Sequence, residues 1–152
     1  MSKHSVFGEI ALELRQLQQS FDAFDEAAAA RLGLNRTDLR CLDVVLADGP
    51  VPAGRISLAL KLSPAATTTV IDRLERAGMV VRSTDPGNRR RVLVAATDAA
   101  RSADAEIFVP VGQAGARALQ EYGPDELAVV LDFLRTARRV QEEQAARVRA
   151  LS

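Results

Sequence analysis

One stretch in the middle of the chain constrains its fold more than any other. Two short helical patterns, at 53–61 and 64–77, are followed by two runs rich in β-branched residues, at 79–84 and 92–95. The turn sequence Asp85-Pro86-Gly87-Asn88 separates these runs, and a proline followed by a glycine favours a tight reversal of the backbone. The sequence therefore predicts two helices and then a β-hairpin, with three arginines directly after the hairpin turn.

The second of these helices has the clearest end signals. Ser63 can cap its start, Pro64 suits a first turn that needs no backbone donor, and Gly78 suits a left-handed stop. Its periodicity turns four side chains toward a core: Thr67, Val70, Ile71 and Leu74. The residues on its outer side are small or polar. A low helix surface beside an arginine-tipped hairpin is the layout of a winged helix-turn-helix, which suits the major groove of DNA and an adjoining minor groove or phosphates.

Longer amphipathic helices are predicted on both sides of this region. Cap candidates from Asn35 onward precede another helix that ends near Asp48. The outer helices carry more apolar residues than the central part can cover, which favours a two-fold dimer. We therefore expect a mainly α fold with a small β wing (α+β), as one domain over 1–152. Within it, the winged helix-turn-helix spans 35–96, with dimerisation helices at 5–30 and 98–150.

Charge is balanced overall but not along the chain. The sequence has 20 basic and 20 acidic residues, yet residues 31–101 carry 12 basic against 7 acidic residues, a net charge of +5. Both flanking parts are net negative. A local basic region is where a DNA-binding module would need it, so we expect affinity to come from a patch and not from general basicity.

Several classes of protein are disfavoured. A single cysteine, Cys41, excludes an internal disulfide. One cysteine and one histidine, His4, are too few ligands for a zinc site. No apolar run reaches the roughly 18 residues of a membrane span, and the start has no secretory pattern, so we expect a cytoplasmic protein. No catalytic constellation, phosphate loop or dinucleotide motif is present, so neither enzymatic activity nor a cofactor is expected.

The motifs from Leu62 to Arg101 resemble the MarR family of bacterial transcriptional regulators. They comprise Leu62-Ser63-Pro64, Val70-Ile71-Asp72-Arg73-Leu74-Glu75, Gly78-Met79-Val80, Arg82, Asp85-Pro86, Arg89-Arg90 and Thr97. The resemblance implies a homodimeric winged-helix protein, usually a repressor, whose affinity for a pseudo-palindromic operator in double-stranded DNA is changed by a small molecule or by oxidation. Four positions depart from the family pattern, among them Ala96 and Ala100, which replace the leucine and glycine of its strand-to-helix junction. Asn88 replaces the usual aspartate of the wing, and Thr69 replaces an arginine or another long polar residue.

Candidate DNA contacts follow from this layout. On the recognition helix they are Ser63, Ala65, Ala66, Thr68, Thr69 and Arg73, and on the wing they are Arg89 and Arg90; Arg55 and Lys61 are weaker phosphate candidates. The alternative for the wing is a solvated turn, and for the helix an ordinary exposed face. Arg73 is interpreted as a phosphate contact, with pairing to neighbouring Asp72 or Glu75 as the alternative.

A ligand site and a second function stay open. The resemblance places a cleft for a small phenolic or anionic ligand near Leu14, Arg15, Phe21, Leu42 and Phe108, although Arg15 also suits a surface salt bridge. Cys41 is either a peroxide sensor or, as its place beside a core position favours, inert packing. The runner-up function is a winged-helix protein-interaction module that does not bind DNA and uses exposed apolar residues such as Leu58.

Overall fold

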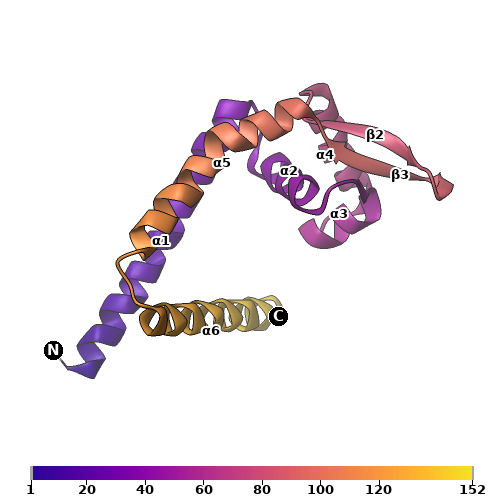
Figure 1. Cartoon of the computed structure of the whole chain (residues 1–152). Coiled ribbons are helices and arrows are strands. Elements are labelled where there is room, and N and C mark those ends of the chain that lie inside the picture. Colours follow the sequence, from indigo (N-terminus) through magenta and orange to yellow (C-terminus); the bar gives the residue numbers. More distant parts are fainter. Residues whose placement is uncertain (1, 152) are drawn as a thin grey trace. The chain divides into compact units, whose positions relative to one another are not determined.

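The computed structural model describes residues 2–151 (Figure 1), and the chain divides into two compact units between Ile107 and Phe108. The elements are α1 (Lys3–Leu32), α2 (Arg36–Asp48), β1 (Val51–Pro52), α3 (Ala53–Leu60), α4 (Pro64–Arg76), β2 (Val80–Asp85), β3 (Asn88–Ala96), α5 (Asp98–Leu119) and α6 (Pro124–Arg149). The expected mainly α architecture with a small β wing is confirmed. Among the described residues, no helix combines the length and the apolar character that crossing a membrane would require.

The core of the first unit lies between α2, α3, α4 and the base of the sheet. Its apolar side chains are Cys41, Leu42, Val45, Val51, Ile56, Leu60, Val70, Ile71, Leu74, Val80 and Val94, together with Ala96 at the end of β3 and Ala100 in α5. The inward face predicted for α4 is confirmed, because Thr67, Val70, Ile71 and Leu74 are all buried. Apolar residues three and four positions apart share one helix face, so this core fixes which side of α4 is turned outward.

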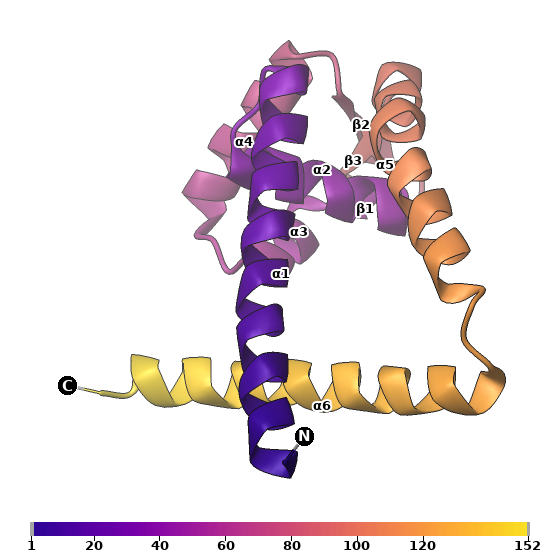
Figure 2. The same cartoon turned by 90° about the vertical axis from the view of Figure 1, so that its left-hand side faces the viewer.

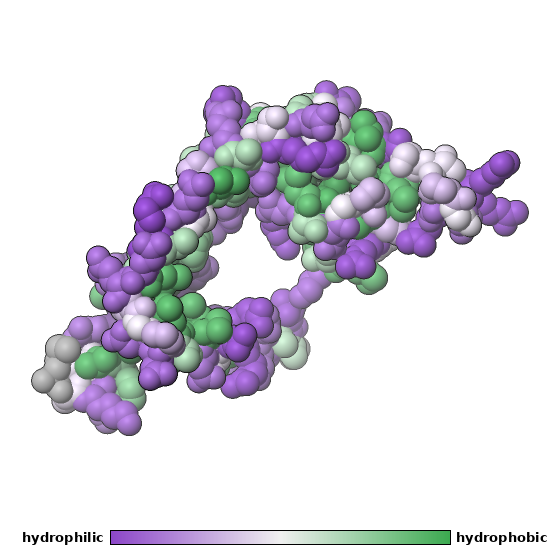
Figure 3. Space-filling view, in the orientation of Figure 1, coloured by the Kyte–Doolittle hydropathy of each residue, from purple (hydrophilic) through white to green (hydrophobic). Residues whose placement is uncertain are grey.

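The sheet has three antiparallel strands in the order β1-β3-β2. β2 and β3 form the predicted hairpin, with Val80 opposite Ala96 and Asp85 opposite Asn88. Figure 1 shows this hairpin extending away from α4, and its tip is coloured hydrophilic in Figure 3. β1 was not predicted, since a strand of two residues is too short to show an alternating pattern. It pairs Val51 with Val94 and so ties the start of α3 to the wing.

Local signals for the helix ends are confirmed. The Asn35 Oδ1 accepts a hydrogen bond from the Asp38 backbone N–H at 2.8 Å, and the Ser63 Oγ accepts one from Ala66 N–H at 3.1 Å. Gly78 has φ +73°, the left-handed region that glycine enters without strain. The Thr97 hydroxyl donates to the Gly78 carbonyl at 2.7 Å and accepts from a backbone N–H of α5. These caps set where α2 and α4 begin and how the chain leaves the wing.

Exposed apolar side chains are common on the outer helices of each unit. On α1, which Figure 2 shows as one long helix, they include Phe7, Ile10, Leu12, Leu17 and Phe21. In the second unit no residue of α6 is buried, and the exposed apolar residues include Val129, Val130, Leu131, Phe133, Leu134 and Val140. Green patches in Figure 3 mark apolar residues that reach the surface. Such surfaces are typical of helices that pack against another chain.

Candidate nucleic-acid interface

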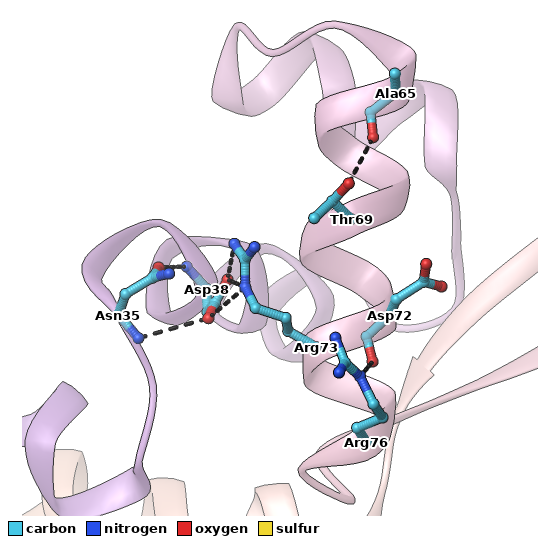
Figure 4. Close-up of polar contacts among 7 residues, drawn as sticks. All are labelled: Asn35, Asp38, Ala65, Thr69, Asp72, Arg73 and Arg76. Carbon is cyan, nitrogen blue, oxygen red and sulfur yellow. Dashed lines mark hydrogen bonds and ion pairs between the residues drawn. The ribbon is translucent and has the colours of Figure 1, made fainter.

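The outward face of α4 is small and held in one conformation. Ala65, Thr68 and Thr69 are exposed, and Ala66 is half-buried. The Thr68 hydroxyl donates to the Pro64 carbonyl at 3.0 Å, and the Thr69 hydroxyl donates to the Ala65 carbonyl at 3.1 Å (Figure 4). Both hydroxyl hydrogens are therefore used within the helix. Each threonine presents outward a methyl group and the remaining lone pairs of its oxygen.

A half-buried pair of hydroxyl groups joins α4 to α3. The Ser57 hydroxyl donates to the Thr67 Oγ1 at 2.7 Å, and the Thr67 hydroxyl donates to the Ser63 carbonyl at 2.9 Å. The turn between the two helices is tight, because Lys61 takes a left-handed conformation with φ 55°. The first turn of α4 is thus positioned by hydrogen bonds from inside the module and not by its exposed side chains.

Arg73 has a partner that the sequence analysis did not consider. Its guanidinium binds the carboxylate of Asp38 on α2, with Nη2 2.7 Å and Nε 3.0 Å from Oδ1, and Nε 3.1 Å from Oδ2 (Figure 4). The Asp38 side chain is 4% exposed, whereas that of Arg73 is 36% exposed. The hydrogen bond to Asp38 raises the pKa of Arg73, so its positive charge is fixed. Arg73 therefore links α4 to α2 through an ion pair with a buried carboxylate, and the phosphate contact expected for it stays a prediction.

Arg82 binds the two carboxylates expected as alternative partners for Arg73. From β2, its Nη2 lies 2.6 Å from Asp72 Oδ1, its Nη1 lies 3.1 Å from Glu75 Oε1, and its backbone N–H donates to Glu75 Oε2 at 3.2 Å. One side chain therefore fastens the wing to α4. It also balances negative charge on the helix face that would otherwise oppose a phosphate backbone.

The three wing arginines differ in their partners. Arg91 lies 3.6 Å from the Asp85 carboxylate, measured from Nε to Oδ2. Arg89 and Arg90 are exposed, and within the described residues neither guanidinium has an ion pair. The Asn88 Oδ1 accepts the Arg90 backbone N–H at 3.1 Å, so the amide that replaces the family's aspartate still orders the turn. The charge at the tip belongs to Arg89 and Arg90.

The weaker phosphate candidates, Arg55 and Lys61, differ in whether they have an ion-pair partner. Arg55 lies 3.2 Å from Asp48, measured from Nε to Oδ2, on an exposed edge of the module. Lys61 is exposed in the turn before α4 and has no ion pair within residues 2–151. Arg76, in the last turn of α4, donates from Nε to the Asp72 carbonyl at 3.4 Å and is otherwise exposed. Lys61 and Arg76 are thus cations near the two ends of α4 that lack a carboxylate partner in the part of the chain the structure describes.

The residues expected to line a ligand cleft differ in their exposure. Arg15 and Phe21 are exposed on α1, and Leu14 is half-buried. Leu42 is only 2% exposed and belongs to the core, because α2 turns Cys41 and Leu42 inward together, so its assignment as a cleft-lining residue is corrected. Phe108 belongs to the second unit. A ligand site stays a prediction that rests on the exposed residues of α1.

Cys41 and His4 have ordinary structural surroundings. The Cys41 side chain is fully buried, and burial, with a smaller contribution from Asp38, raises the pKa of its thiol to about 11. A protonated, buried thiol is a poor nucleophile, in agreement with inert packing. His4 is exposed and its ring lies 6.3 Å from that of Phe7. Among the described residues, no group of three or more metal-ligating side chains is found.

Comparison with known proteins gives one consistent result. The MarR family model matches residues 34–92. The HTH-type transcriptional regulator YcgE of Bacillus subtilis (strain 168) is 35% identical over 126 residues, which cover 83% of this chain and 82% of that protein. Two solved structures have a similar fold. YusO of Bacillus subtilis has a TM-score of 0.65 at 22% identity, covering 93% of this chain and 99% of its own. A MarR family protein of Bacillus stearothermophilus has a TM-score of 0.65 at 21% identity, covering 95% and 99%. The chain therefore belongs to the MarR family of transcriptional regulators.

Proposed function

We propose that this protein is a sequence-specific DNA-binding repressor that acts as a two-fold dimer. The α4 helix enters the major groove, and Arg89 and Arg90 bind a neighbouring minor groove or its phosphates. The observation that carries the proposal is the division of the arginines around α4. Those that hold the module together, Arg73 and Arg82, are bound to carboxylates, whereas the two at the wing tip are not.

This division argues against the view that the wing is only a solvated turn. Arg91 lies within ion-pair distance of the Asp85 carboxylate at the base of the same turn. The guanidinium groups of Arg89 and Arg90 have no carboxylate partner within the described residues. Two adjacent cations at an exposed tip repel each other weakly in water, and a bound anion would relieve that repulsion. A nucleic-acid backbone supplies such anions at regular spacing.

Exposed apolar side chains support the dimer. Apolar residues on α1 and α6 lack cover within their own units, and a second copy of the chain would bury them. A dimer presents two α4 helices to half-sites about one helical turn, or about 34 Å, apart. We further propose that a small phenolic or anionic ligand releases the repressor by favouring a dimer whose α4 helices no longer match that spacing.

The test is a salt series of DNA binding by fluorescence anisotropy, with a labelled duplex from the gene's own upstream region. The double variant Arg89→Ala/Arg90→Ala is compared with Arg138→Ala/Arg139→Ala, which removes the same charge from α6. If each wing arginine neutralises one phosphate, the wing variant loses four contacts per dimer, and the slope of log K against log salt becomes shallower by about 3 to 4. The α6 variant should keep the wild-type slope. Equal slopes for the wing variant and the wild type would refute the wing assignment.

One observation favours a second candidate function, a protein-interaction module. Leu58 on α3 is 81% exposed, more than any other large apolar residue of the protein's described part. A protein partner would bury it, and Leu58→Ser would then weaken that complex while DNA binding stayed unchanged. If Leu58→Ser lowers DNA affinity as much as the wing variant does, the residue belongs to the DNA interface and this second candidate fails.

A further inference from the structure

We infer that α4 recognises the C5-methyl groups of thymine, so that each half-site of the operator carries A·T pairs where the first two turns of α4 face the major groove. The inference rests on the proposed DNA-binding function and specifies which bases that function selects. It follows from the side-chain groups of α4 that make no contact within the protein.

Three of the four long polar side chains of α4 are held in ion pairs, and the fourth lies in its last turn. Within Pro64–Arg76, every residue of which the structure describes, four side chains could reach a base edge, and each has a partner: Asp72 and Glu75 bind Arg82, Arg73 binds Asp38, and Arg76 bonds the Asp72 carbonyl. Figure 4 shows Arg73 directed to α2. The commonest specific contact with guanine is a bidentate arginine or lysine. Arg73 would have to abandon a buried carboxylate to make it, and Arg76 lies in the last turn of the helix.

The first two turns of α4 present methyl groups and hydrogen-bond acceptors. Ala65 and Ala66 add methyl groups, and the hydroxyl hydrogens of Thr68 and Thr69 are already bonded to carbonyls of their own helix. The remaining lone pairs of each threonine oxygen can accept but not donate. In the major groove an A·T pair offers a thymine C5-methyl group and the N6 amino donor of adenine, with the thymine O4 acceptor between them. A threonine held in this rotamer is complementary to the methyl group and to the amino donor.

A G·C pair fits the same surface poorly. It presents two acceptors and one donor, as an A·T pair does, but it has no C5-methyl group to contact the methyl groups that the first two turns of α4 expose. The wing agrees with this preference, because arginines favour the narrow minor groove of A-tracts.

The test begins with selection of duplexes from a random pool by the wild-type protein. Thymines in the selected half-site are then replaced one at a time by deoxyuridine, which removes only the C5-methyl group. Binding should weaken by about fourfold at each thymine under α4, the value expected for one buried carbon. Replacing cytosine by 5-methylcytosine at a mismatched position should recover part of the affinity, because it returns a methyl group to the groove.

Two matched variants locate the effect on the protein. Thr69→Ser removes the methyl group and keeps the hydroxyl, whereas Thr69→Val keeps a methyl group and removes the hydroxyl. Thr69→Val should discriminate thymine from deoxyuridine at its position as the wild type does, and Thr69→Ser should bind the two duplexes equally. These variants change an exposed side chain, so both should fold.

Three results would overturn the inference. One is a wild-type affinity that is unchanged by deoxyuridine at every thymine of the half-site, and another is a selected half-site with guanine under α4. The third is a Thr69→Ser variant that discriminates as strongly as the wild type. Failure of the proposed function looks different: the wild type then shows no salt-dependent binding to any selected duplex, and the methyl recognition falls with it.

Discussion

Replacing Arg73 by alanine should leave the carboxylate of Asp38 buried without its main partner. The Asp38 side chain is 4% exposed and would keep only a 3.5 Å contact from the Asn35 backbone N–H. Removing one member of a buried ion pair costs roughly 3 to 5 kcal/mol. Because the Arg73 side chain is 36% exposed, water can enter the space it leaves, and we expect the low end of that range, about 3 kcal/mol.

The double variant of Asp38 and Arg73 should lose less stability than the two single variants together. Asp38→Ala leaves a partly exposed guanidinium that water can solvate, so we expect a loss of about 2 kcal/mol. In Asp38→Ala/Arg73→Ala no carboxylate is left unpaired. The double variant should therefore be more stable than additivity predicts by about 2 kcal/mol. Arg76→Ala, three residues further on and without a carboxylate partner in the described chain, is the control and should stay within about 0.5 kcal/mol of the wild type.

Urea unfolding followed by far-ultraviolet circular dichroism measures these differences. All variants must be compared at one protein concentration, since dimer formation would add a concentration-dependent term to the apparent stability. A shift of the unfolding free energy below about 0.5 kcal/mol for Arg73→Ala would refute the reasoning, and so would strict additivity in the double variant.

Two further predictions concern a thiol and a charge. Burial raises the pKa of Cys41 to about 11, above the ordinary 9.0, so the stabilisation from the neutral thiol is complete below pH 9 and is lost as the pH rises toward 11. A disulfide reagent at pH 8 should label native Cys41 only as fast as the protein opens, and immediate labelling would contradict this. Arg82→Ala should weaken DNA binding by exposing the charges of Asp72 and Glu75. Adding Asp72→Asn and Glu75→Gln should restore binding, and an anisotropy titration in which the neutralised variant stays as weak would show that the charges are not the cause.

Features encoded over a few residues could be predicted from the sequence. The buried face of α4, its serine cap and the left-handed Gly78 each depend on residues within one or two helical turns, and the structure has them as expected. The hairpin turn is equally local. Its second strand is longer than predicted, because β3 continues through the arginines at its start, where the sequence shows no β-branched residues.

Pairings between distant elements could not be predicted. Arg73 had two acidic neighbours in sequence, and its actual partner, Asp38, lies 35 residues away. Helix α4 turns Arg73 toward α2, while Asp72 and Glu75 face the strand that carries Arg82. The family resemblance places Leu42 in a ligand cleft, whereas its apolar character suits a core as well. Only the packing of α2 against its neighbours distinguishes the two.

The sequence by itself therefore determined the type of molecule: the order of helices and strands, the winged helix-turn-helix, and the arginines at the wing tip. It did so because hydrophobic periodicity, caps and turns act through short-range geometry. The tertiary structure decided which charges remain free. An ion pair forms where two elements meet, and that meeting is set by the burial of the whole core. Arg73 and Arg82 are thereby bound within the protein, and Arg89 and Arg90 are left for a partner.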